Sequence, residues 1–132
     1  MREITDIPAG KLHKAGEDYL ETILTLQQTK GLVRSVDVAR QMNYSKPSVC
    51  KAVSVLQEAG YLSVDSEHFL HLTEIGQAIA ERVYERHCFF TELLIKIGVD
   101  PAIAEADACE MEHCISAQSF ECLKKARDRF DL

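Results

Sequence analysis

One change in the spacing of apolar residues limits the fold of this 132-residue chain more than any other feature. Up to Gly60, and again after Thr73, apolar residues recur every three or four positions, which is typical of helices that bury one face. Between these regions, two short runs rich in apolar and aromatic residues, 61–64 and 69–72, flank the polar segment 65–68. This pattern indicates a β-hairpin. The spacing therefore predicts a mainly α chain with one hairpin near its middle.

Capping residues and apolar spacing together predict six helices. We expect them at approximately 14–29, 35–42, 45–59, 73–97, 101–114 and 116–129. Ser35 and Ser45 are the expected N-caps of the second and third helices, and Pro47 suits a first helical turn. The last helix is amphipathic, and we expect it to pack loosely.

Three helices followed by a hairpin is the element order of a winged helix-turn-helix. We therefore expect a DNA-binding domain over residues 1–73, in which the helix that follows Ser45 enters the major groove. The remaining residues, 74–132, are expected to form an all-helical dimerisation domain.

The charge distribution agrees with this division. The net charge is −6, made up of −1 over residues 1–73 and −5 over residues 74–132, and a chain this acidic is a poor general nucleic-acid binder. The segment 30–60 nevertheless carries five Lys or Arg against two acidic residues, which suits contact with phosphates. The acidic C-terminal half is suited to a cation.

The same sequence argues against several other classes of protein. No apolar run approaches a membrane span, and the N-terminus lacks the apolar region of a secretion signal, so we expect a cytoplasmic protein with no membrane partner. Five cysteines without a CxxC pair favour reduced thiols over disulfides.

Three groups of residues carry ligand chemistry. Asp18 and Glu21 share one helical face, and Cys109, Glu112 and His113 stand at i, i+3 and i+4 of a later helix. A thiolate, a carboxylate and an imidazole together suit a divalent transition metal. A solvated acidic face and a polar surface with a chance cysteine explain the same spacings. His87, beside an apolar stripe, also fits an ordinary core histidine.

Four ordered motifs resolve these alternatives through a resemblance. They are Glu17-Asp18-Tyr19-Leu20-Glu21, Ser45-Lys46-Pro47-Ser48-Val49, Arg82-Val83-Tyr84-Glu85-Arg86-His87 and Cys109-x-x-Glu112-His113. Together they resemble the diphtheria-toxin-repressor family of metal-dependent transcriptional repressors over residues 13–130. In length the chain is similar to the short, manganese-transport-regulator-like branch, which lacks the SH3-like domain of the longer members.

This resemblance implies a set of site residues. The implied metal ligands are Asp18, Glu21, His87, Cys109, Glu112 and His113. Cys109 departs from the short branch, which has a carboxylate there, and matches the iron-responsive branch. That branch also has a second, ancillary site, two of whose ligands are replaced here by Thr91 and Glu105. The implied DNA contacts are Ser45, Pro47, Ser48 and Lys51, while Arg34 and Lys46 are phosphate candidates on charge alone, and Cys50 is expected to be a packing residue.

The resulting hypothesis is a homodimeric, metal-activated repressor of metal-uptake genes that binds a palindromic operator in double-stranded DNA. The expected cofactor is Fe(II), because Cys109 supplies a soft donor, with Mn(II) as the alternative. We expect no small organic ligand and no enzymatic activity. A thiol-based redox regulator that uses Cys88, Cys109, Cys114 or Cys122 is the main alternative function, and a small metalloenzyme is a third.

Overall fold

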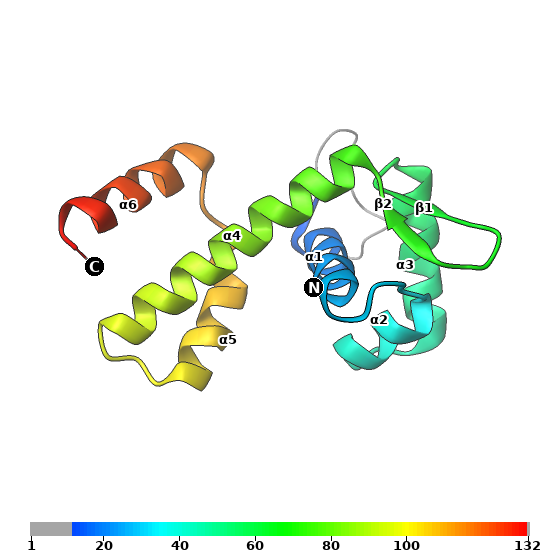
Figure 1. Cartoon of the computed structure of the whole chain (residues 1–132), viewed down its shortest axis with the longest axis horizontal. Coiled ribbons are helices and arrows are strands. Elements are labelled where there is room, and N and C mark those ends of the chain that lie inside the picture. The colour runs from blue at the N-terminus through cyan, green and yellow to red at the C-terminus, as the bar shows by residue number, and fades with distance from the viewer. Residues whose placement is uncertain (1–11, 132) are drawn as a thin grey trace. The chain divides into compact units, whose positions relative to one another are not determined.

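The computed structural model describes residues 12–131 and has the predicted order of elements (Figure 1). The helices are α1 (Lys14–Lys30), α2 (Ser35–Met42), α3 (Lys46–Glu58), α4 (Glu74–Lys96), α5 (Pro101–Met111) and α6 (Ala117–Arg129). The strands are β1 (Leu62–Val64) and β2 (Leu70–Leu72). The mainly α fold class, with a helix-turn-helix, a two-stranded wing and a helical C-terminal part, is confirmed. No helix among the described residues is long and apolar enough to cross a membrane.

The chain divides into two compact units, one that ends at Glu81 and one that begins at Arg82, so α4 contributes to both. The domain boundary expected from the sequence, after residue 73, falls at the start of α4 and stays a prediction. Each unit is described here by itself.

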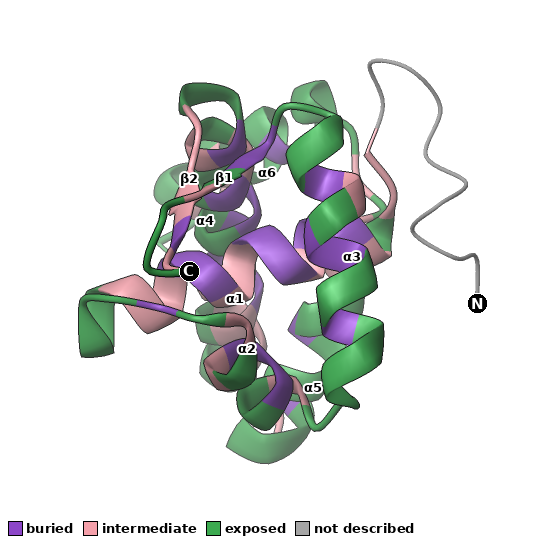
Figure 2. Ribbon diagram, turned by 90° about the vertical axis from the view of Figure 1, so that its right-hand side faces the viewer, coloured by how far each residue is buried: buried purple, intermediate pink, exposed green. Residues whose placement is uncertain are grey.

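The first unit is organised around the apolar faces of α1, α2 and α3. Leu20, Ile23, Val38, Val49 and Leu56 are all fully enclosed, as their helical spacing predicts. Burying such side chains contributes about 1.5–3 kcal/mol each relative to leaving them exposed. The opposite face of α3 is left in solvent, as the alternation of buried and exposed segments along this helix in Figure 2 shows.

The two helix caps of the helix-turn-helix differ from each other. Ser45 caps α3 as predicted, because its hydroxyl accepts a hydrogen bond from the Ser48 backbone N–H at 3.3 Å. Ser35 is not the cap of α2, so that prediction is wrong. Arg34 is the N-cap residue, and its backbone N–H donates to the Asp37 carboxylate at 2.8 Å. The side chain at the third helical position therefore stabilises this end of α2.

The hairpin is a short wing. β1 and β2 pair antiparallel with Leu62 opposite Leu72, so the strands are shorter than the predicted runs 61–64 and 69–72. The backbone N–H of Leu70 also donates to the Val33 carbonyl at 2.7 Å, which attaches the segment before α2 to the outer edge of the wing. This backbone hydrogen bond covers part of the otherwise open edge of β2, as a third strand would.

Glycine at position 76 allows the wing to connect closely to α4. A Cβ atom on Gly76 would lie 2.1 Å from the Tyr61 carbonyl oxygen, a backbone atom that cannot move independently. We therefore expect Gly76→Ala to lower the free energy of unfolding by about 1–3 kcal/mol, the usual cost of overpacking. Chemical denaturation measures this change. Lys96→Ala, in an exposed position of the same helix, is the control, and equal stability of the two variants would contradict the close approach.

In the second unit, three aromatic rings join α4 to α6. Phe89, Phe90 and Phe120 are each almost fully buried, and their ring centroids lie 5.2–6.0 Å apart. Most residues of α6 are nevertheless exposed, and Phe120 is its one buried residue, which agrees with the expectation that the last helix packs loosely. Phe120 supplies one specific anchor for the helix, since edge-to-face aromatic pairs add to the energy of burial.

Candidate metal centre and nucleic-acid interface

Three potential ligands converge inside the second unit. One ligand atom each from His87, Cys109 and Glu112 lies within 4.8 Å of the other two. His87 Nδ1 is 2.9 Å from Glu112 Oε2 and 3.7 Å from Cys109 Sγ. His87 comes from α4 and Cys109 from α5, so packing of these two helices assembles a nitrogen, sulfur and oxygen donor set.

Glu112 lies between two histidines. Its side chain is only 1% exposed, and its second oxygen, Oε1, is 3.2 Å from His113 Nε2. A carboxylate in such a place requires charge-assisted partners, because burying an unpaired charge is very costly. The two oxygens of Glu112 thus face two different imidazoles, an arrangement suited to a shared ligand.

The path of the chain at Glu112 differs from the predicted one. Helix α5 ends at Met111 rather than near Cys114, and Glu112 is its C-cap. The Glu112 backbone N–H still donates to the Ala108 carbonyl at 3.0 Å, so Cys109 and Glu112 keep the predicted spacing of about one turn, and only His113 lies beyond the end of the helix. Cys109 Sγ lies 3.7 Å from His87 Nδ1. His113 Nε2 lies 3.2 Å from Glu112 Oε1.

Arg86 lies in one of the four family motifs, and the motif by itself predicts no role for it. It is buried, and its guanidinium donates to the backbone carbonyls of Ile115 at 2.5 Å and of Glu112 at 3.5 Å. It also lies over the Phe120 ring, 5.3 Å from the centroid. Arg86 thus holds the turn that carries Glu112 and His113. The sequence contains one indication of this role: Arg86 lies on the same helical face as the apolar residues Val83 and Phe90. A charge buried on such a face needs partners.

Asp18 and Glu21 belong to α1 in the first unit and are both partly buried. Asp18 forms an ion pair with Lys14 at 3.3 Å, one turn earlier on the same helix. Their predicted place on one helical face is consistent with the unbroken helix across residues 14–30. Their role as metal ligands stays a prediction.

The donor set of the second unit fits a divalent transition metal. Bonds from zinc-like cations measure about 2.0–2.1 Å to imidazole nitrogen and about 2.3 Å to thiolate sulfur, so two ligands of one ion lie up to roughly 4.5 Å apart. The spacing within 4.8 Å requires only small side-chain adjustments to reach this limit. A mixed nitrogen, sulfur and oxygen set favours Fe, Co or Zn over Mg or Ca.

The predicted DNA-contacting residues lie at and just before the start of α3, on its solvent side. Ser45, Lys46, Pro47, Ser48 and Lys51 are all exposed, whereas Val49, Ala52 and Val53 are buried. Ser45 donates its hydroxyl hydrogen to the Ser48 hydroxyl at 2.8 Å. The hydroxyl hydrogen of Ser48 is thereby left to donate to an acceptor outside the helix.

Cys50 contradicts one prediction. The sequence suggested a small packing residue, but Cys50 is exposed, on the solvent side of α3 beside Lys51. The helical register explains the difference, since Val49 and Val53 occupy the inward positions and Cys50 follows Val49 by 100°. Arg34, the remaining phosphate candidate, is also exposed and lies before α2.

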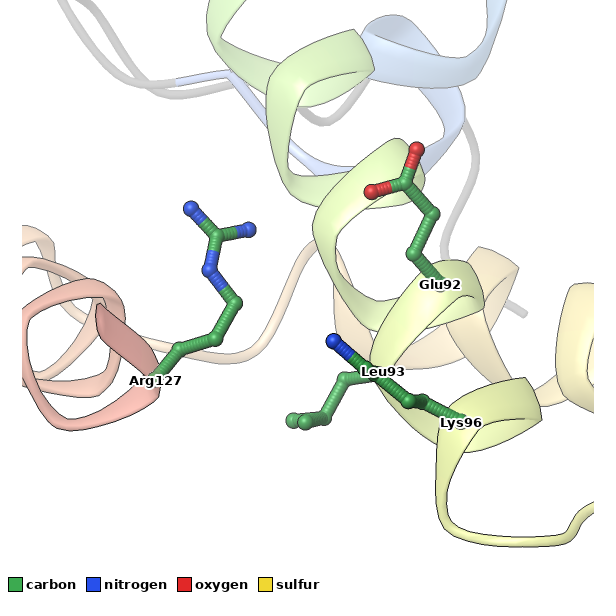
Figure 3. Close-up of a pocket in the computed structure, with 4 residues that line it drawn as sticks. All are labelled: Glu92, Leu93, Lys96 and Arg127. Carbon is green, nitrogen blue, oxygen red and sulfur yellow. The ribbon is translucent and has the colours of Figure 1, made fainter. Parts of the chain in front are cut away.

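A hollow between α4 and α6 has a different character (Figure 3). Its lining consists of Glu92, Leu93, Lys96 and Arg127, with no histidine or cysteine. Arg127 packs over the Phe89 ring, 4.7 Å from its centroid. The lining therefore provides no soft metal donor, and the ligand chemistry of the second unit is concentrated at His87, Cys109 and Glu112.

Comparison with known protein families and structures gives consistent results for both parts of the chain. Residues 11–70 match the model "Iron dependent repressor, N-terminal DNA binding domain", and residues 73–131 match "Iron dependent repressor, metal binding and dimerisation domain". The chain is 32% identical over 108 residues to the transcriptional regulator MntR of Escherichia coli, covering 82% of this chain and 70% of the relative. It is 36% identical over 105 residues to MntR of Listeria monocytogenes, covering 80% and 74%.

Two solved structures share the fold. The manganese regulator SloR superimposes with a TM-score of 0.76 at 25% identity, covering 86% of this chain and 53% of that one. IdeR of T. acidophilum gives 0.71 at 25% identity, covering 88% and 54%. The chain thus spans about half the length of these solved structures.

Proposed function

The chain belongs to the iron-dependent repressor family of metal-dependent, DNA-binding transcriptional regulators, and we propose that it is a homodimeric repressor of metal-uptake genes. The convergence of His87, Cys109 and Glu112 supports this proposal, because these three potential ligands lie in the part of the chain that matches a metal-binding and dimerisation domain. The family is one of regulators, so we assign no catalytic residue.

The proposed ligand set contains residues from both units. His87, Cys109, Glu112 and His113 come from the second unit, and the family resemblance adds Asp18 and Glu21 from α1. When bound, the cation supplies a cross-link that restricts the orientation of the DNA-binding unit relative to the dimerisation unit. Such a restriction favours the arrangements that fit a palindromic operator, whose half-sites lie one helical turn apart, on the order of 34 Å.

The proposed ligands also contact neighbouring side chains. Glu112 Oε2 lies 2.9 Å from His87 Nδ1, Glu112 Oε1 lies 3.2 Å from His113 Nε2, and Asp18 pairs with Lys14. These contacts hold the side chains near one another, so the side chains lose little conformational entropy when a metal binds. The contacts must also be exchanged for metal bonds, so protons on either histidine compete with the cation.

Fe(II) is the proposed activating metal, with Mn(II) as the competing candidate. Cys109 favours Fe(II), because a soft thiolate strengthens binding of later first-row ions relative to Mn(II). The opposing observation is that one of the similar structures, SloR, is named as a manganese regulator. Aspartate and glutamate ligands, Asp18 among them, suit Mn(II) equally well.

The proposed partner is double-stranded operator DNA, contacted by α3 in the major groove. The exposed start of α3 and its two lysines support this assignment. We place the regulator in the cytoplasm, where its operator DNA lies.

An operator-binding titration tests the function. Duplexes are selected from a randomised library with the full chain, and binding is then measured under anaerobic, reducing conditions against free Fe(II), Mn(II), Co(II) and Zn(II). We expect metal to increase affinity strongly and metal-free protein to bind weakly. DNA binding that is independent of metal but responds to peroxide would instead support the thiol-based regulator.

Cys50 provides a direct probe of the proposed interface. Because Cys50 is exposed on the solvent side of α3, bound DNA will shield its thiol from a maleimide reagent. We expect at least about a tenfold slower labelling of Cys50 in the metal-loaded complex, corresponding to a bound fraction above about 90%. Mass spectrometry of each cysteine peptide measures this, and Cys122, exposed on α6, is the internal control. Equal labelling of Cys50 with and without DNA would place the interface elsewhere.

A further inference from the structure

We propose that Arg34 is a positioning residue that fixes the wing to the start of α2, and that it does not act as a phosphate contact. This inference rests on the proposed DNA-binding function and assigns a different role to a residue that charge alone would assign to the DNA backbone. Its consequence is that α3 and the wing meet DNA as one rigid surface.

The contacts of Arg34 all point toward the wing or α2. Its Nε donates to the backbone carbonyl of Glu67 at 3.2 Å, and its guanidinium lies over the Phe69 ring, 4.1 Å from the centroid. A short cation–π contact of this kind fixes both the plane and the position of the guanidinium. The side chain is thus held at two points by residues more than thirty positions away in the sequence.

The backbone around Arg34 is fixed as well. The preceding carbonyl, of Val33, accepts from Leu70 in β2, and the Arg34 backbone N–H donates to Asp37. Lys30 also pairs with Asp37 at 3.1 Å. Burial raises the pKa of Asp37, but hydrogen bonds from Arg34 and Lys30 outweigh it, so the pKa is lower than usual. The carboxylate is therefore charged at neutral pH and holds the end of α2 in place.

The wing tip has little capacity to bind phosphate by itself. Asp65 accepts hydrogen bonds from His71 at 2.8 Å and from the backbone N–H groups of Glu67 and Phe69. The His71 hydrogen bond, followed by that from Phe69, lowers the pKa of Asp65. Between β1 and β2 the described residues include two carboxylates and no lysine or arginine. Because this acidic wing tip does not attract phosphate, a residue outside the wing has to position it relative to DNA.

Substitutions of Arg34 and Phe69 separate positioning from charge. Arg34→Lys keeps the positive charge but removes the planar fork and its stacking, and Phe69→Leu changes no charge at all. We expect each to weaken affinity for the selected operator about tenfold, since each removes the stacking contact and frees the wing. The double variant should lose little more than either single variant, because both act on one contact.

The salt dependence of binding gives an independent measurement. A lost phosphate contact lowers the slope of log affinity against log salt by about one, whereas a misplaced wing leaves the number of neutralised phosphates nearly unchanged. We therefore expect Arg34→Gln to weaken binding with a slope close to that of the wild type. Lys51→Gln, in the proposed interface on α3, is the comparison variant, and its slope should fall by about one.

The design uses the full chain, the operator duplex selected from a randomised library, and saturating Fe(II) or Mn(II). Phe69→Tyr keeps the ring and should restore the affinity that Phe69→Leu loses, which distinguishes stacking from general destabilisation if Arg34→Lys folds poorly. Wild-type affinity of Arg34→Lys, together with a reduced salt slope for Arg34→Gln, would overturn the proposal and make Arg34 a phosphate contact. Equal losses in Phe69→Tyr and Phe69→Leu would also overturn it. Failure of the proposed function is distinct, because the wild type itself would then select no DNA.

Discussion

Glu112→Gln will remove most of the metal response of DNA binding while leaving the fold in place. The glutamine amide has nearly the same shape as the carboxylate and can still donate to or accept from the neighbouring histidines, but it carries no charge. Even a residue that only supports a metal ligand costs about 10–100-fold in affinity when removed. We therefore expect at least about a 100-fold higher metal concentration for half-maximal operator binding.

Glu105→Gln is the matched control for this experiment. Glu105 is exposed on the same helix, α5, so its substitution removes one negative charge without touching the cluster. Isothermal titration with Mn(II) measures metal affinity, and analytical ultracentrifugation follows the oligomeric state. Equal metal affinity in the two variants would exclude Glu112 from the ligand set.

Asp18→Ala tests the contribution of the first unit to the same response. Asp18 is more exposed than Glu112, with 27% of its side chain accessible, so this substitution has little effect on packing. If Asp18 is a ligand, metal-stimulated DNA binding is lost while metal-free binding is unchanged. Normal stimulation in Asp18→Ala would contradict the proposed cross-link between the two units.

The fold was predictable because most of its determinants are local. Ser45, Pro47 and the apolar spacing around Val49 and Leu56 specify α3 within a few turns, and the predicted α2 has the bounds that the structure shows. The wing was recognisable from the change of period and a polar turn. Each of these signals requires only neighbouring residues.

The features that local patterns did not predict depend on residues far apart in the chain. Arg86, 29 positions before Ile115, binds backbone carbonyls of the turn that follows α5. Phe120 anchors α6 through rings on α4 that no local pattern connects to it. The contacts of Arg34 with Glu67 and Phe69 likewise join residues more than thirty positions apart.

The candidate site shows the same limit. The spacing of Cys109, Glu112 and His113 revealed the ligand types, but the regular helix that this spacing assumed ends at Met111. The structure instead pairs Cys109 and Glu112 with His87, which lies more than twenty residues earlier. Spacing can therefore identify candidate ligands, whereas packing of α4 against α5 determines which of them share a cation.

Cys109→Glu will change the metal preference of the regulator. In the wild type, the thiolate strengthens binding of Fe(II), Co(II) and Zn(II) relative to Mn(II), which prefers hard oxygen donors. We expect Fe(II) to activate operator binding at about tenfold lower free concentration than Mn(II), a difference of about 1.4 kcal/mol. Replacing the thiolate with a carboxylate should narrow or reverse this gap, because it removes the soft donor and keeps a negative charge.

The position of Cys109 makes this substitution feasible. Its side chain is exposed, so the longer glutamate can be accommodated without displacing a core residue. Cys114→Glu is the control, because it replaces an exposed thiol outside the cluster with the same carboxylate. Anaerobic fluorescence anisotropy with buffered Fe(II) and Mn(II) measures the two activation midpoints. Equal activation of the wild type by both ions, unchanged in Cys109→Glu, would show that the metal preference is set by the oxygen and imidazole ligands. In that case the carboxylates that Asp18 and Glu21 contribute would define a manganese-type site despite the thiolate.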